Sequence, residues 1–192
     1  MCSIGTCFKF LALMSIFTII WFLLVFITCH TAPYPKIKVI SASINSLTVN
    51  NTKLTTNWNI SLSVTNHAFF EIIYFEDVSV DVFYMDSYLV LNTSTLPSFT
   101  TDIMSVIHMN SSVNGFVDSG AANGIDRSLH QYGMVTFGLD VSASIKFINL
   151  VLNSGWKNLN VVCYPLRFAI CSNANNTTSG ILLESLTCSK SK

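Results

Sequence analysis

Hydrophobic and polar residues are distributed in two different ways along this chain. Residues 10–29 form a run of 20 residues without a charged side chain, with apolar residues on every face of a helix. At 1.5 Å per residue such a helix would be about 30 Å long, the thickness of the hydrocarbon core of a bilayer. After the run, apolar residues alternate with Asn, Ser and Thr. The pattern predicts one N-terminal transmembrane helix followed by a β-rich domain.

The alternation has a period of two, most clearly in segments 58–64, 78–84 and 135–147. This alternation is typical of strands with one buried and one solvated face. Turn-forming pairs such as Asn50-Asn51 and Ser154-Gly155 separate the segments. We therefore expect an all-β domain, an antiparallel fibronectin- or immunoglobulin-like β-sandwich of about seven strands. The strands are expected near 37–45, 55–65, 72–84, 87–92, 99–109, 132–147 and 158–168, with a short one near 181–187. The segment 113–130 is the least strand-like, and a helical turn is expected around its end, at 125–131.

These elements predict four parts: a short cytosolic tail (1–9), a transmembrane signal-anchor helix (10–29), a stalk (30–36) and an extracellular β-sandwich domain (37–192). A cleaved signal peptide is the alternative to an anchor. Such peptides have apolar cores of about 7–15 residues and a cleavage site with small residues. The run here is longer, and the best candidate site, His30-Thr31-Ala32, has His where a small residue belongs. This favours an uncleaved anchor.

Lysines on both sides of the run give no orientation by the positive-inside rule. Sequons of the type N-x-[ST] break the tie, because six follow the run and none precedes it. They begin at Asn50, Asn59, Asn92, Asn110, Asn175 and Asn176. We expect a single-pass glycoprotein of the plasma membrane, with a cytosolic N-terminus and an extracellular C-terminal domain.

Cysteine positions agree with that topology. Cys163 is expected to face inward on a strand and Cys188 to lie near the end of a returning segment, so we predict a disulfide between them, with Cys171 free or exchanged as a partner. Cys2 and Cys7 are candidates for palmitoylation beside the membrane, and simple thiols are the alternative.

Charged residues make up 10% of the chain and the formal net charge is zero. This argues against nucleic-acid binding and against a polybasic lipid-binding surface. The four histidines are scattered, and the sequence has no G-x-S-x-G, H-E-x-x-H or phosphate-binding glycine loop. A Cys163–His130 pair is the nearest approach to a catalytic dyad, and a structural cysteine is the simpler interpretation. We expect no enzymatic activity, no catalytic or metal-binding residues and no cofactor.

Two local clusters allow alternative interpretations. The acidic residues Glu71, Glu76, Asp77 and Asp81 are either ligands of a calcium ion or a solvated strand end, and the second is favoured. The aromatic residues Phe69, Phe70, Tyr74 and Phe75 are either part of the core or an exposed contact surface, and the core is favoured.

A series of short motifs also follows the order of a known family. The motifs are Leu47-Thr48, Leu54, the stretch 58–66, Tyr74-Phe75, the segment 78–84, Leu96-Pro97-Ser98-Phe99, Gly155-Trp156 and Val161-Val162-Cys163. With the N-terminal anchor they resemble the plant non-race-specific disease resistance and harpin-induced-like proteins. The resemblance implies a late-embryogenesis-abundant group-two domain with a fibronectin-like β-sandwich. The family often has Asn-Pro-Asn where this chain has Asn66-His67-Ala68, which would make it a divergent member.

The resemblance implies a plasma-membrane protein that responds to pathogens or stress through protein contacts, and it supplies no catalytic residues. We therefore expect a membrane-anchored, non-enzymatic cell-surface protein of plant defence or stress responses. Its expected partners are the lipid bilayer and other membrane or cell-surface proteins, in an oligomeric state that the sequence leaves open. The alternative is a stress-protective or lipid-contacting β-sandwich protein. A lipid-contacting protein would need an internal groove, whereas the interior of a protein that acts through surface contacts would be filled by side chains.

Overall fold

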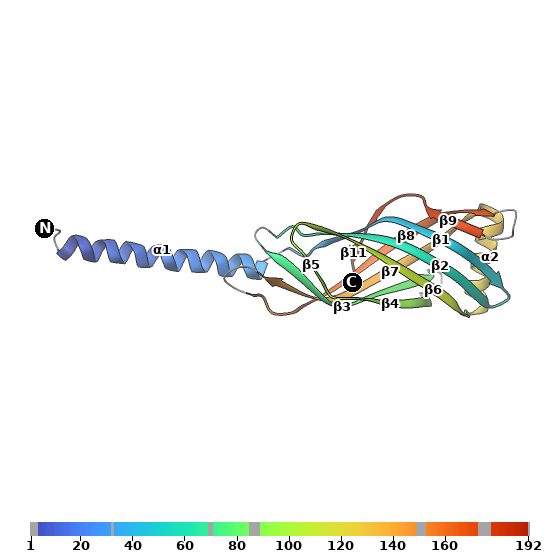
Figure 1. Cartoon of the computed structure of the whole chain (residues 1–192), viewed down its shortest axis with the longest axis horizontal. Helices are drawn as coiled ribbons and strands as arrows, with labels where there is room; N and C mark the ends of the chain where they lie inside the picture. The colour runs from blue at the N-terminus through green and yellow to red at the C-terminus, as the bar shows by residue number, and fades with distance from the viewer. Residues whose placement is uncertain are drawn as a thin grey trace.

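The computed structural model describes residues 4–31, 33–68, 71–84, 89–148, 153–172 and 178–191, and within the first helix it describes the side chains of residues 9–24, 26 and 27. These parts form two helices and one antiparallel sheet (Figure 1). The helices are α1 (Ile4–Thr31) and α2 (Ser119–Tyr132). The strands are β1 (Lys36–Asn50), β2 (Lys53–Thr65), β3 (Ile72–Tyr84), β4 (Leu89–Leu96), β5 (Phe99–Thr101), β6 (Met104–Phe116), β7 (Met134–Ile148), β8 (Lys157–Ser172), β9 (Thr178–Leu182), β10 (Leu186–Thr187) and β11 (Ser189–Lys190).

All eleven strands belong to a single sheet. Its main path runs β4-β3-β7-β8-β9-β1-β2-β6, while β5 pairs with β3, β10 with β1 and β11 with β8. The two strands at the ends of this path approach each other, because Asn92 Nδ2 of β4 donates a hydrogen bond of 2.6 Å to Ser111 Oγ of β6. The sheet is therefore nearly closed and barrel-like.

This architecture confirms the all-β, antiparallel expectation but not the expected sandwich of about seven strands. The strands follow one another in a continuous hydrogen-bonded path and do not form a clear pair of packed layers. The alternation in the sequence is compatible with both architectures, because each strand has one buried and one solvated face in either case. What separates them is which strands pair, and a period of two carries no information on pairing.

Several element boundaries also differ from the expected ones. The strand expected at 99–109 is divided at Asp102 and Ile103 into β5 and β6, and β6 continues to Phe116. The helical turn expected at 125–131 is the full 14-residue helix α2. Its first turn is capped by Asp118, whose carboxylate accepts a 2.9 Å hydrogen bond from the Ala121 amide, and it ends at Gly133 in the left-handed conformation (φ 61°).

The interior is filled by large rings from strands that are not neighbours. Trp58 of β2 lies edge-on to Phe137 of β7 and Phe168 of β8, with ring centroids 4.5 and 5.4 Å apart. Because β2 is adjacent to neither strand in the sheet, these contacts cross the interior. A second ring pair, Phe75 and Phe99, stacks at 4.5 Å between the paired strands β3 and β5. Burial of a ring of this kind contributes roughly 1.5–3 kcal/mol, so the contacts of Trp58 hold opposite walls of the sheet together.

The two ends of the sheet are covered differently. α2 lies across the end away from α1 and buries Ala121, Ala122 and Ile125 (Figure 1). At the opposite end α1 extends away from the sheet as a separate rod (Figure 1). We call the end from which α1 departs the basal end and the end covered by α2 the distal end.

α1 corresponds to the helix expected over residues 10–29, so the helical part of that expectation is confirmed. Among the residues that the structure describes, no helix satisfies the length and apolarity needed to cross a membrane. The transmembrane part of the expectation is therefore not borne out.

Asn66 stabilises the basal end of the sheet at the position where the family motif begins. Its side chain is 8% exposed and contacts three backbone groups. Nδ2 donates to the carbonyls of Glu71 (2.6 Å) and Asp102 (2.9 Å), and Oδ1 accepts from the amide of Ala68 (2.8 Å). The carboxamide thus joins the turn after β2 to the turn between β5 and β6, without the proline that the family often has next.

We predict that Asn66→Ala lowers the free energy of unfolding by about 2–4 kcal/mol, because it leaves buried backbone groups without partners. Asn57→Ala is the matched control. Asn57 is exposed and donates a single long bond of 3.3 Å to Ser46 Oγ, so we expect a change below about 0.5 kcal/mol. Urea unfolding of the full chain in mild detergent, followed by circular dichroism, measures both. Equal stability of the two variants would show that the turn does not depend on this carboxamide.

Candidate interaction surface

The predicted disulfide is present between Cys163 and Cys188. Cys163 is fully buried on β8, and Cys188 lies between β10 and β11 in the C-terminal segment. The Cys188 amide also donates to the Ile37 carbonyl of β1 at 2.9 Å. The bridge therefore fastens the C-terminal segment across β1 and β8 near the basal end. Cys171 is free and exposed, so the alternative in which it replaces one of the partners is wrong.

Four of the predicted glycosylation sites lie on described strands. Asn50, Asn59 and Asn110 are exposed, and Asn59 and Asn110 are directly opposite each other on β2 and β6. Asn92 differs, because it is half-buried and its amide donates to Ser111 and, at 3.4 Å, to Ser94. Three sequons thus present a free outer surface to a glycan, whereas the fourth lies where the sheet closes.

Other predicted positions fall where the structure gives no description. Asn175, Asn176 and Cys2 lie outside the described residues, as do the aromatic residues Phe69 and Phe70. Cys7 belongs to α1, but its side chain is outside the description. Glycosylation at Asn175 and Asn176 and palmitoylation at Cys2 and Cys7 therefore stay predictions.

The acidic cluster does not form an ion site in the described part of the chain. Glu71 is buried and its two carboxylate oxygens have no hydrogen-bond partner there, whereas Asp77 is exposed. A β-bulge interrupts β3 between Glu76 and Ser79. No three His, Cys, Asp or Glu side chains of the described residues come together as a metal site would require. The solvated strand end favoured from the sequence describes Asp77, but not Glu71, which is buried.

One arrangement that the sequence did not indicate is a Ser–His contact on the outer face of the sheet. Ser61 Oγ lies 2.9 Å from His108 Nδ1, on neighbouring strands β2 and β6. A nucleophile and a base at this distance also need an orienting group and a pocket for substrate. The pair instead lies on exposed strand surface, which suits a cross-strand polar contact. The structural interpretation of Cys163, favoured over a Cys163–His130 dyad, is confirmed, because Cys163 is in the disulfide.

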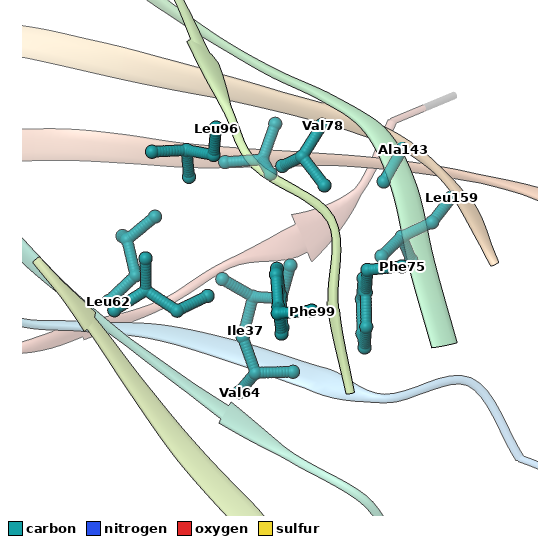
Figure 2. Close-up of a pocket in the computed structure, with 11 residues that line it drawn as sticks. Ile37, Leu62, Val64, Phe75, Val78, Leu96, Phe99, Ala143 and Leu159 are labelled. Carbon is teal, nitrogen blue, oxygen red and sulfur yellow. The ribbon is translucent and has the colours of Figure 1, made fainter. Parts of the chain in front are cut away.

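Figure 2 shows the small apolar cavity inside the sheet. Its volume is about 10 Å³, and side chains such as Leu62, Phe75 and Phe99 line it. Roughly 10–15 Å³ is needed to hold one water molecule, whereas ligand pockets in proteins measure about 300–1,000 Å³. This cavity is therefore a packing defect and has no room for an acyl chain.

At the basal end, lysine side chains that are exposed or half-buried lie close to aromatic rings. Lys190 Nζ lies 4.9 Å from the centroid of the Tyr34 ring, and Lys146 Nζ lies 5.8 Å from that of Trp156. Tyr74, one of the aromatic cluster, packs edge-on against Trp156 at 5.9 Å and is half-buried, while its neighbour Phe75 is in the core. We call the following set the basal collar: Tyr34, Lys36, Lys146, Trp156, Lys157 and Lys190.

The collar residues come from three distant parts of the sequence. Lys36 begins β1, Lys157 begins β8 and Lys190 ends β11, so each lies at a strand terminus facing the same end of the sheet. In the sequence the collar lysines lie in three separate segments, and neither the segments nor the low overall charge indicates that these lysines come together. Predicting that these lysines lie together would have required knowledge of which strands pair.

No protein-family model matches the sequence, and no curated protein is similar to it. The resemblance to the non-race-specific disease resistance and harpin-induced-like proteins therefore stays a prediction.

Replacing both Cys163 and Cys188 with Ala should lower the free energy of unfolding by about 3 kcal/mol, because the bridge closes a loop with a sequence separation of 25 residues. Cys171→Ala is the control, and its exposed side chain predicts a change within about 0.5 kcal/mol. Thermal unfolding of the full chain with and without reductant measures the effect. A native chain that reductant does not destabilise would contradict the prediction.

Proposed function

We propose that this protein is a membrane-attached, non-catalytic cell-surface protein whose β-domain acts through contacts with other membrane or surface molecules. Its setting, as the family resemblance implies, is a plant defence or stress response. The proposal depends on two observations taken together. The first is that α1 extends from the sheet as an apolar rod (Figure 1). The second is that side chains fill the interior of the domain, while its lysine–aromatic pairs and its exposed sequons lie on the surface.

The apolar surface of α1 supports attachment to a membrane. Large side chains along it are more than half exposed, including Phe10 (67%), Leu13 (69%) and Phe17 (63%). Soluble monomers rarely leave a continuous apolar surface larger than a few hundred Å² uncovered. The uncharged run 10–29 has the composition that a bilayer accepts. We therefore propose that lipid covers this helix in the native protein.

The domain interior favours contact over lipid sheltering. A protein that carries a lipid inside needs a groove of several hundred Å³, and the cavity in Figure 2 is about 10 Å³. The rings of Trp58, Phe137 and Phe168 occupy the space that such a groove would need. The alternative of a lipid-contacting protein is therefore restricted to contacts on the outer surface.

The disulfide and the exposed sequons support an extracellular position of the domain. The Cys163–Cys188 disulfide is the kind of bond that persists in oxidising compartments. Asn50, Asn59 and Asn110 are exposed on strands, where glycans would project into solvent.

The first experiment is alkaline carbonate extraction of membranes from plant cells that express the full chain, combined with protease treatment of sealed vesicles and deglycosylation. We expect the chain to stay in the membrane pellet, its C-terminal domain to be protected from protease, and deglycosylation to shift its gel mobility. Release by carbonate would mean that α1 is held by another protein or at the surface of the membrane. Digestion of the domain with no shift would place it in the cytosol and sink the cell-surface proposal.

The sequons should differ in occupancy. Asn59→Gln should remove one glycan from the gel shift, because Asn59 is exposed on the outer face of β2. Asn92→Gln should leave the shift unchanged, since a glycan on Asn92 would have to fit beside the 2.6 Å bond to Ser111 where β4 meets β6. Mass spectrometry of the glycopeptides checks both, and an occupied Asn92 would contradict the structural argument.

A further inference from the structure

A hollow of about 110 Å³ lies within the basal collar, between the start of β1 and the C-terminal segment. Its walls include apolar side chains such as Ile37 and Leu159. Tyr34, Lys36 and Lys190 also line it. The hollow therefore combines an apolar lining with two cationic groups.

No carboxylate of the described residues neutralises the charges at this hollow. Lys36 and Lys190 are exposed, and no Asp or Glu lines the hollow. Among the described residues, neither ammonium group forms an ion pair. Lys190 instead lies over the Tyr34 ring, which attracts a cation weakly without cancelling its charge. The two lysines thus give the hollow a positive charge that favours binding of an anion.

The size of the hollow restricts what that anion is. Pockets that enclose whole drug-sized ligands measure about 300–1,000 Å³, so about 110 Å³ suits a small charged group rather than a whole lipid or cofactor. A phosphate or phosphodiester is such a group, and lysine binds it as a point charge.

The position of the hollow indicates where a phosphodiester comes from. Tyr34 follows the last residue of α1, Thr31, by three residues, a distance that extended chain spans in at most about 10 Å. If α1 lies in a bilayer, the collar therefore sits at the level of the headgroups. Tyr and Trp are enriched at that level, and lysines close to it are attracted to anionic lipids. Tyr34, Trp156 and the collar lysines match both preferences.

We propose that this hollow binds the phosphodiester of a phospholipid headgroup, with Lys36 and Lys190 supplying the charge and anionic headgroups bound most tightly. The proposal rests on the membrane attachment proposed above and adds a specific lipid contact to it. Bound lipid would hold the domain upright against the membrane, with its distal end directed away.

Native mass spectrometry of the full chain in non-ionic detergent tests the site, with dioctanoyl phosphatidylglycerol as the probe. The variant is Lys36→Gln/Lys190→Gln, and the matched control is Lys53→Gln/Arg127→Gln, which removes the same charge at exposed positions near the distal end. We expect the collar variant to bind about 30-fold more weakly, since each lysine near anionic lipid contributes about a fivefold factor. The control should stay within about twofold of the native chain, and Lys36→Arg/Lys190→Arg should retain binding.

Equal binding by the collar variant and the control would overturn the proposal. Inorganic phosphate that binds the native chain as tightly as the lipid would also overturn it, because the hollow would then hold a free anion. Unfolding temperatures of the variants exclude loss of fold as a cause. Release of the chain from cell membranes by carbonate would contradict insertion of α1 in the bilayer alone, whereas a native chain that stays in the membrane pellet but does not bind the lipid would contradict the headgroup site alone.

Discussion

Closure of one sheet around a filled interior is the constraint on which the rest of this structure depends. The edge strands β4 and β6 meet through Asn92 and Ser111, and inside them rings from β2, β7 and β8 touch across the space. An open sheet of this length would expose one apolar face and two unpaired edges, both of which promote aggregation. Curling the sheet removes the face, and the approach of β4 to β6 leaves little edge. Side chains therefore fill the interior and leave no room there for a ligand.

Because the interior is filled, we expect any function to lie at the ends and on the outer face of the sheet. The two ends differ from each other. α2 seals the distal end with small buried side chains, Ala121 and Ala122 among them. At the basal end the strands finish in lysines and aromatic residues, and the disulfide holds the C-terminal segment in place beside β1. The bond that stabilises the domain thus also fixes the position of Lys190 relative to Lys36. The disulfide that stabilises the domain and the lysines on its surface thus lie together at the basal end.

Much of the fold was predictable from the sequence, because alternation is a local property. Every residue from Trp58 to Val64 at an even position is buried, as a period of two requires, and Cys163 was placed inward for the same reason. The pairing of Cys163 with Cys188 followed from that placement. Strand order was not predictable in this way, since a residue such as Trp58 gives no local sign that its contacts are Phe137 and Phe168. A sandwich and a nearly closed sheet differ in which strands pair, and the local pattern carries no sign of pairing either.

The basal collar was hidden for the same physical reason. Lys36 lies 121 residues before Lys157, and Lys157 lies 33 residues before Lys190, in a chain with only 10 lysines and arginines. Antiparallel pairing brings the start of β1, the start of β8 and the end of β11 to one end of the sheet. Low overall charge therefore does not exclude a local cationic site, because an antiparallel fold gathers strand termini at two places only. In this chain one of those places is also where the apolar helix α1 departs (Figure 1), and this coincidence is the reason that we propose a lipid headgroup as the ligand there.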